Sequence, residues 1–137
     1  MSVTQSPRLS LATLARVPDT VAMPAYDPAA TRIGIVHFGP GAFHRAHQAV
    51  YLDDLLGDAP DWAISAVSLH SAGVRDALAP QDGLYTLMLL GEQPQLRVIG
   101  AIREVLCAPR QREAVLSRLA DPGGRLGTLT ITEKGYC

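Results

Sequence analysis

The sequence is poor in the features that mark secreted, membrane and nucleic-acid-binding proteins. Its two cysteines, Cys107 and Cys137, are too few for the disulfide framework of a small secreted domain and fit a reducing cytoplasm. The apolar stretch 9–15 is interrupted by Ser10 and Thr13, and it is too short for a secretory leader or a membrane span. A formal net charge of −1 leaves no basic excess for nucleic acid. We therefore expect a cytoplasmic protein with no nucleic-acid or membrane partner.

What is present is the composition and patterning of an ordinary globular α/β protein. Hydrophobic residues make up 47% of the 137 residues, a length that limits the chain to one domain. Residues 1–31 contain four prolines and little periodicity, which predicts an extended N-terminal arm with a helical turn near its start. From residue 32 strand-like and helix-like segments alternate, which predicts a mostly parallel sheet with right-handed crossovers. The expected strands are 32–38, 62–69, 84–90, 95–100, 101–107 and 126–132, and the expected helices are 42–56, 73–78 and 110–119.

The most informative segment joins the first expected strand to the first expected helix. Gly39 and Gly41 stand there one residue apart, with Pro40 between them. A glycine at 39 allows a sharp turn off the strand, and a glycine at 41 allows the backbone to approach an anion closely. With the N–H groups of the following helix, this layout predicts that the backbone around 39–41 holds the diphosphate of a dinucleotide. The spacing by itself also fits a plain strand-to-helix turn.

Several further blocks follow this loop in a characteristic order. The loop itself reads Gly39-Pro40-Gly41-Ala42-Phe43-His44-Arg45-Ala46-His47-Gln48, and His44 stands where a third glycine is usual. Downstream come Tyr51-Leu52-Asp53, the block 75–87, Ile102-Arg103-Glu104 and Thr130-Ile131-Thr132-Glu133-Lys134-Gly135-Tyr136. Together these blocks resemble the long-chain mannitol dehydrogenase family, and the resemblance extends over about residues 10–137. That family includes mannitol 2-dehydrogenases, arabinitol dehydrogenases and fructuronate- and altronate-type oxidoreductases.

The resemblance implies part of a Rossmann domain from a nicotinamide-dependent oxidoreductase. It implies a doubly wound, mostly parallel sheet over 32–137 with an inserted antiparallel hairpin (84–90 and 95–100), of which this chain holds the first half plus one strand. In the family, hydride passes between the nicotinamide and C2 of a polyol, ketose or keto-uronate, as in the mannitol–fructose and mannonate–fructuronate pairs. The catalytic lysine and its asparagine and histidine partners come from a helical domain that is absent here. We therefore expect a fragment or truncated gene product that has no catalytic residue and is inactive alone.

The choice between the two nicotinamide cofactors is weakly encoded. The second expected strand ends at His70 without the carboxylate that would bind the ribose hydroxyl, and Asp61 precedes that strand. Arg75 would favour a 2′-phosphate, so NADP stays open, while the resemblance favours NAD. The residues predicted to bind the cofactor are Gly39, Pro40, Gly41, Ala42, Phe43, His44, His70 and Glu133.

The histidines near the loop raise the question of a metal. His44 and His47 lie one helical turn apart with His37 nearby, but no carboxylate or cysteine accompanies them, so a zinc site is not expected. At the start of a helix they are expected to contact phosphate or a neighbouring domain instead. Phe43 begins the helix face that carries Ala46 and is expected to turn toward the sheet, so packing in the core and packing near the cofactor both stay open.

The end of the sequence suggests two further roles. Glu133 follows the last expected strand, and ligands bind at the carboxyl ends of such strands. The resemblance places this segment beside the nicotinamide and gives Glu133 a proton-passing role, whereas a solvated pair with Lys134 is the simpler alternative. The last strand is expected to be an unpaired edge beside exposed apolar surface, which predicts self-association. The alternative function is a non-catalytic nucleotide-binding remnant.

Overall fold

The computed structural model describes residues 6–132, and its centre is a four-stranded parallel sheet. The strands are β2 (Ile33–Phe38), β3 (Ala63–Ser68), β6 (Ile102–Cys107) and β7 (Leu126–Leu129), and their spatial order is β6-β3-β2-β7. The chain therefore builds outward from β2 through β3 to β6 and then returns to the other side of β2. This is the strand order of a doubly wound Rossmann-type sheet, so the expected fold class is confirmed.

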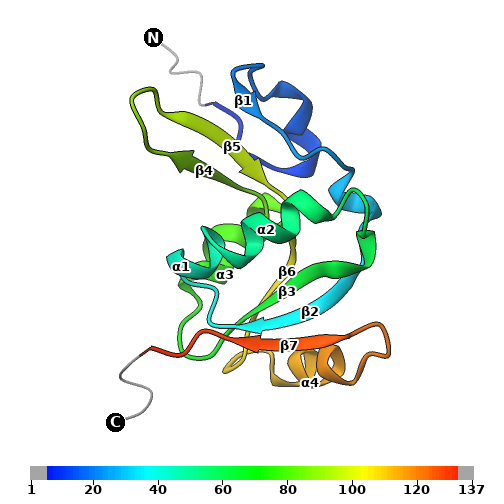
Figure 1. Ribbon diagram of the computed structural model, residues 1–137. Coiled ribbons are helices and arrows are strands. Elements are labelled where there is room, and N and C mark those ends of the chain that lie inside the picture. Colours follow the sequence, from blue (N-terminus) through cyan, green and yellow to red (C-terminus); the bar gives the residue numbers. More distant parts are fainter. Residues whose placement is uncertain (1–5, 133–137) are drawn as a thin grey trace.

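Helices cover both faces of this sheet (Figure 1). The helices α1 (Ala42–Arg45), α2 (Gln48–Leu55) and α3 (Gly73–Leu78) lie on one face, and α4 (Arg112–Ala120) lies on the other. The strands are mostly apolar on both sides, because successive side chains point to opposite faces and both faces are buried. Ile35 packs in the larger core with Ala49 of α2, while its neighbour Val36 packs with Val115 of α4.

A second, smaller sheet lies across α2 from the first (Figure 1). It contains β1 (Val21–Ala22), β5 (Gln95–Ile99) and β4 (Tyr85–Leu89), in the order β1-β5-β4. The hairpin of β4 and β5 is antiparallel, as expected, and β1 pairs with β5 in parallel. Within the segment expected to be an extended arm, the structure thus has a strand and two short 3₁₀ helices. The 3₁₀ helices within residues 6–132 are η1 (Leu11–Arg16), η2 (Pro28–Ala30), η3 (Pro60–Trp62) and η4 (Ala79–Gln81).

A buried carboxylate fastens α2 to the small sheet. Asp53 is 4% exposed and accepts hydrogen bonds from the Tyr26 hydroxyl, from Arg97 Nη2 at 2.7 Å and from the Gly100 N–H at 2.8 Å. Arg97 also pairs with the exposed Asp54 at 2.6 Å. Burial, the hydrogen bond to Asp53 and the negative charge of Asp53 raise the pKa of Tyr26 well above its usual range, which keeps the phenol protonated as a donor.

The expected single helix over 42–56 is wrong in two respects. Helix α1 ends at Arg45 and α2 begins at Gln48, because His47 takes a backbone conformation of φ −127° and ψ −95° that no α-helix contains. Phe43 and Ala46, expected to turn toward the sheet, are exposed, Phe43 by 68%. The buried residue of α1 is therefore His44 and not Phe43.

Candidate functional site

The candidate site lies where the strand order of the larger sheet reverses. Strands β3 and β7 flank β2, and the ladder between β2 and β7 continues past their ends, because the Thr130 N–H donates to the Phe38 carbonyl at 2.9 Å. The turn at Gly39 follows β2 directly, so it sits at the carboxyl ends of these strands (Figure 1). In open parallel sheets this is the place where ligands bind.

Gly39 makes the sharp turn that the sequence predicts. Its φ of +92° is a conformation that residues with a side chain rarely adopt. Its N–H donates to the Val67 carbonyl at 3.0 Å, and its carbonyl accepts the N–H of Gly41 at 2.9 Å. Both glycine N–H groups are therefore used inside the protein, and Pro40 has none. Contrary to our expectation, the backbone at 39–41 shapes the loop and offers no free donor to a diphosphate.

The free backbone donors come immediately afterward. The N–H groups of Ala42, Phe43 and His44 have no protein acceptor among residues 6–132, because the first helical bond is donated by Arg45 to the Gly41 carbonyl. Gly41 has an ordinary φ of −71°, and a Cβ built on it would meet no atom within 4 Å. The fold therefore does not itself require glycine at 41, and the space over this residue is open to a ligand.

Two buried histidines stack directly beneath the turn. The rings of His37, at the end of β2, and His44, in α1, lie 3.5 Å apart and 7° from parallel, and the residues are 3% and 2% exposed. His37 Nδ1 lies 2.6 Å from the Thr128 hydroxyl, and its Nε2 lies 3.0 Å from the Thr130 hydroxyl and 3.2 Å from the Gly39 carbonyl. His44 Nε2 lies 2.8 Å from Gln48 Oε1. These contacts join the turn to β7 and α2.

Burial keeps this pair neutral near pH 7. It lowers the pKa of His44 to about 4, to which the neighbouring His37 also contributes, and burial lowers the pKa of His37 despite the Gly39 carbonyl. His44 Nδ1 is the one buried side-chain nitrogen or oxygen without a partner in the described part of the chain. The side chain of His44 is therefore buried beside His37, at the wall of a hollow, whereas the sequence suggested a contact with a phosphate at the surface.

An open hollow of about 300 Å³ adjoins the two histidines. It is walled by α1 and α2 on one side and by the end of β7 on the other. Phe43 stands at its rim, which excludes the core position that the sequence left open, and its ring stacks on His47 with centroids 5.0 Å apart. Tyr51 meets His47 edge-on, so an exposed aromatic row runs along α1 and α2. The lining residues are His37, Phe43, His44, His47, Gln48, Thr128, Leu129, Thr130 and Ile131.

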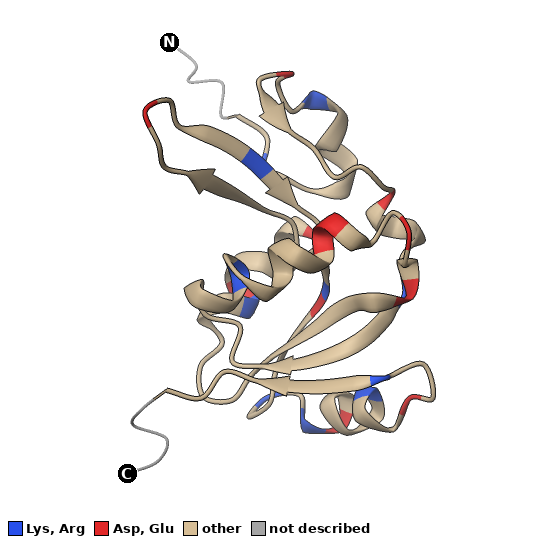
Figure 2. Cartoon of the chain, viewed as in Figure 1, with Lys and Arg blue, Asp and Glu red and all other residues tan. Residues whose placement is uncertain are grey.

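The other residues considered for the cofactor do not gather at the turn. His70 is exposed in the loop after β3, and Arg75 of α3 contacts only Asp76 at 3.5 Å among the described carboxylates. Asp61 lies before β3, at the opposite edge, where it pairs with Arg125. No acidic residue occurs between 28 and 52, so the turn and α1 carry no negative charge (Figure 2). Glu133 and Lys134 lie outside the described residues.

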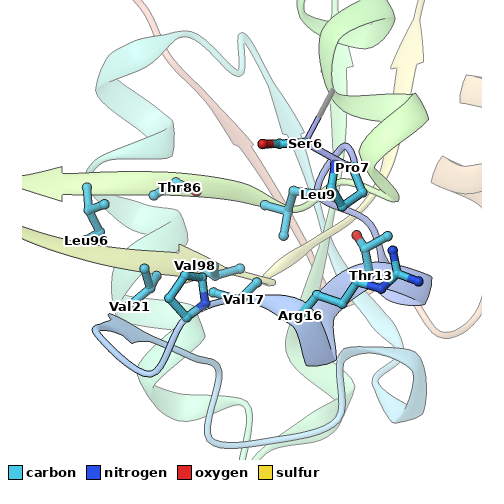
Figure 3. A pocket seen from close by; sticks show the side chains of 11 residues that line it. Ser6, Pro7, Leu9, Thr13, Arg16, Val17, Val21, Thr86, Leu96 and Val98 are labelled. Carbon is cyan, nitrogen blue, oxygen red and sulfur yellow. The ribbon is translucent and has the colours of Figure 1, made fainter. Parts of the chain in front are cut away.

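The remaining features of residues 6–132 concern metal clusters, membrane-spanning helices and further hollows. No group of three or more His, Cys, Asp or Glu side chains in this range could hold a metal ion. Within the same limits, no helix is long and apolar enough to cross a membrane. A second hollow of about 380 Å³ lies between the N-terminal segment and the hairpin (Figure 3). Its wall is mostly aliphatic, with Arg16 the charged residue that lines it.

The sequence reasoning missed the residues that brace the turn. Thr128 and Gln48 were not predicted to take part, and His37 was considered only as a metal ligand. A signal was available, because Thr128 and Thr130 alternate on a strand expected to pair with the one that carries His37, and such residues share a face. The register that sets His37 opposite Thr128 is visible only in the structure.

The comparisons with known proteins agree with this geometry. Residues 33–136 match the family model described as the mannitol dehydrogenase Rossmann domain. The chain is 44% identical to a mannitol 2-dehydrogenase of Pyrenophora tritici-repentis over 121 residues and to a polyol:NADP oxidoreductase of Gluconobacter oxydans over 130 residues. These alignments cover 85% and 90% of this chain, but 21% and 27% of the two relatives. The chain therefore spans about a quarter of the length of these relatives.

Solved structures show the same relationship. The mannitol 2-dehydrogenase of Pseudomonas fluorescens, in a ternary complex with NAD and D-mannitol, superposes with a TM-score of 0.89 at 45% identity. A D-sorbitol dehydrogenase in substrate-free form superposes with a TM-score of 0.85 at 42% identity. They match 96% and 93% of this chain, and in each case 28% of their own chain.

Proposed function

Since the chain belongs to the mannitol dehydrogenase family and carries part of its Rossmann domain, we propose that it is the NAD-binding part of a polyol or sugar-acid dehydrogenase. The substrate class would be a polyol, its ketose or a keto-uronate, oxidised or reduced at C2. The observation that carries the proposal is the glycine turn at the point where the strand order reverses, with open space above Gly41.

The chemistry of the turn fits a dinucleotide diphosphate. The N–H groups of Ala42, Phe43 and His44 point to no protein acceptor among residues 6–132, and the segment 28–52 holds no carboxylate to repel an anion. Gly41 lets a bulky group approach the backbone, and the exposed ring of Phe43 offers an apolar surface beside it. These features support binding of the diphosphate and an adjoining part of the cofactor, with His70 near the adenosine end.

When bound, the nicotinamide would supply the centre that accepts or donates hydride. The residues of this chain would bind and orient the cofactor, and we propose no catalytic residue among them. The base that takes the hydroxyl proton would come from residues beyond the Rossmann domain, which fits the share of the relatives that this chain spans. Glu133 remains a proposed participant in the proton path.

Several finer assignments are part of the same proposal. NAD is favoured because the complex of the Pseudomonas enzyme contains it, although the Gluconobacter relative is named for NADP. Fructuronate-type substrates and a cytoplasmic location rest on the sequence resemblance and the low cysteine count. Self-association is supported by β7, an edge strand with exposed Leu126 and Leu129. We also propose that the boundary between the N-terminal arm and the dinucleotide-binding domain lies at residues 31–32, close to where the family match begins.

A glycine substitution tests the proposed site without disturbing the fold. Gly41→Val should leave the melting temperature unchanged, because residue 41 has an ordinary φ and a Cβ there would meet no atom within 4 Å. It should nevertheless weaken NADH binding at least about tenfold, because the side chain would occupy the space proposed for the diphosphate. Gly57→Val is the matched control, since a Cβ at Gly57 also meets nothing and lies in the turn after α2. NADH fluorescence titration measures the affinity. Absence of binding in the unsubstituted chain, or equal affinity in the two variants, would refute the proposal.

A further inference from the structure

We propose that His37 is a positioning residue that fixes the glycine turn from below, and that His44 holds the His37 ring in place by stacking on it. The inference rests on the proposed dinucleotide site, because it assigns the residues that set the position of that site's loop. Neither imidazole would touch the diphosphate itself. Both are buried, and their polar contacts are with the protein.

The contacts of His37 determine where its proton lies. A carbonyl oxygen can only accept, so the 3.2 Å contact with the Gly39 carbonyl places the hydrogen of the neutral ring on Nε2. Nδ1 is then an acceptor for the Thr128 hydroxyl at 2.6 Å. The Gly39 carbonyl therefore accepts two hydrogen bonds, one from His37 and one from the Gly41 N–H. Both hold Gly39 in its positive-φ conformation.

The contacts of His44 explain why a second ring is needed. His44 Nε2 donates to Gln48 Oε1 at 2.8 Å, and Gln48 Oε1 also lies 3.3 Å from the Thr128 hydroxyl. The one hydrogen of the Thr128 hydroxyl goes to His37 Nδ1, so Thr128 and Gln48 Oε1 are in contact without a hydrogen bond between them. Hydrogen bonds thus join the turn to β7 through His37, and a separate bond joins α1 to α2 through His44 and Gln48. The ring of His44, 3.5 Å from that of His37, blocks movement of His37 away from the turn. The break between α1 and α2 is what lets His44 face inward.

The hydrogen bonds of His37 have a direct consequence for the open edge of the sheet. His37 and Thr128 are register partners on β2 and β7, the two strands between which the strand order reverses. A side chain that bonds Thr128, Thr130 and the Gly39 carbonyl at once therefore sets how far the turn stands from β7. The width of the proposed cofactor crevice depends on that distance.

Two substitutions separate positioning from packing. His37→Phe keeps a ring that can stack on His44 but cannot bond the turn, whereas His37→Gln keeps a donor for the Gly39 carbonyl and an acceptor for Thr128. Glu104→Gln is the control for general loss of stability, because Glu104 bonds Arg118 and Ser65 and has no contact with the turn. Hydrogen exchange of the Gly41 amide, followed by NMR, reports on the turn, and NADH fluorescence reports on binding.

We expect His37→Phe to speed Gly41 exchange and to weaken NADH binding, each by about tenfold relative to Glu104→Gln, because the hydrogen bond from His37 to the Gly39 carbonyl of the turn is lost. In His37→Gln, the rate of Gly41 exchange and the affinity for NADH should both return most of the way to those of the unsubstituted protein. Equal Gly41 exchange in His37→Phe and Glu104→Gln would overturn the inference. If His37→Phe does not fold, the imidazole ¹⁵N shifts of the unsubstituted protein decide, since a hydrogen on Nε2 of His37 supports the inference and one on Nδ1 overturns it. Failure of the unsubstituted protein to bind NADH would refute the proposed function alone, because the exchange rates and the tautomer would still test the turn.

Discussion

We expect Asp53→Ala to destabilise the protein strongly, because its carboxylate is buried and is the meeting point of three donors. The substitution leaves the Tyr26 hydroxyl, the Gly100 N–H and part of the Arg97 guanidinium without an acceptor. Removing one partner of a buried ion pair typically costs about 3–5 kcal/mol of unfolding free energy. The pair is buried on the aspartate side, where the side chain is 2% exposed.

The neighbouring Asp54 sets where in that range the cost should fall. It stays within 2.6 Å of Arg97 Nη2 and is 57% exposed, so Arg97 keeps one partner after the substitution. We therefore expect a loss of about 3 kcal/mol, which for a chain of this size lowers the melting temperature by roughly 10 °C. The exposed pair itself contributes little, so Asp54→Ala should cost at most about 1 kcal/mol.

Urea unfolding followed by the fluorescence of Trp62 measures both variants. Trp62 is the sole tryptophan and packs against the larger core, so its emission reports loss of that core. Asp54→Ala serves as the matched control, because it removes a carboxylate from the same arginine without burying an unpaired group. If the two variants differed by less than about 1 kcal/mol, the assignment of Asp53 as the clamp between α2 and the small sheet would be refuted.

Two further predictions concern the histidine pair and the turn. The folded protein holds fewer protons at His44 than the unfolded chain between pH 6.5 and about 4, so its free energy of unfolding should fall by up to roughly 3 kcal/mol as the pH is lowered through this window. Urea titrations at several pH values measure this slope, and an identical slope in His44→Phe would contradict it. Gly39→Ala should cost about 1–2 kcal/mol, because an alanine at φ +92° is strained and its Cβ would lie 3.3 Å from Thr130 Cβ. Calorimetry tests this, and a melting temperature equal to that of the unsubstituted chain would show that the turn adapts.

The fold class and strand positions could be predicted because each strand is short, apolar and followed by a turn or a helical period. The segment 62–69, for example, was expected as a strand and contains β3 (Ala63–Ser68), and α3 was placed at its observed bounds. These are local signals. In the doubly wound fold that was expected, the fourth strand lies beside the first, and β7 pairs with β2 accordingly.

The errors concern tertiary contacts, several of them between residues distant in sequence. Nothing near Ala46 and His47 breaks a helix, so the division of α1 from α2 follows from the burial of His44 against His37, a tertiary contact that overrides propensity. The burial of Asp53 was not predicted, because it depends on Tyr26 and Gly100, which lie 27 and 47 residues away. The expectation that the backbone around 39–41 holds a diphosphate did not foresee the internal bonds of the turn, because the Gly39 N–H donates to the Val67 carbonyl of another strand and the Gly41 N–H donates to the Gly39 carbonyl.

The parallel pairing of β1 with β5 bears on how the chain acquires its shape. Val21 finds its register partner at Leu96, so some 75 residues must be synthesised before the early strand has anything to pair with. Assembly that depends on such remote partners is slow, because the entropy of closing a long loop is lost before the hydrogen bonds between the strands can form. The beginning of the polypeptide therefore settles among the last parts, after the helix and hairpin that it covers.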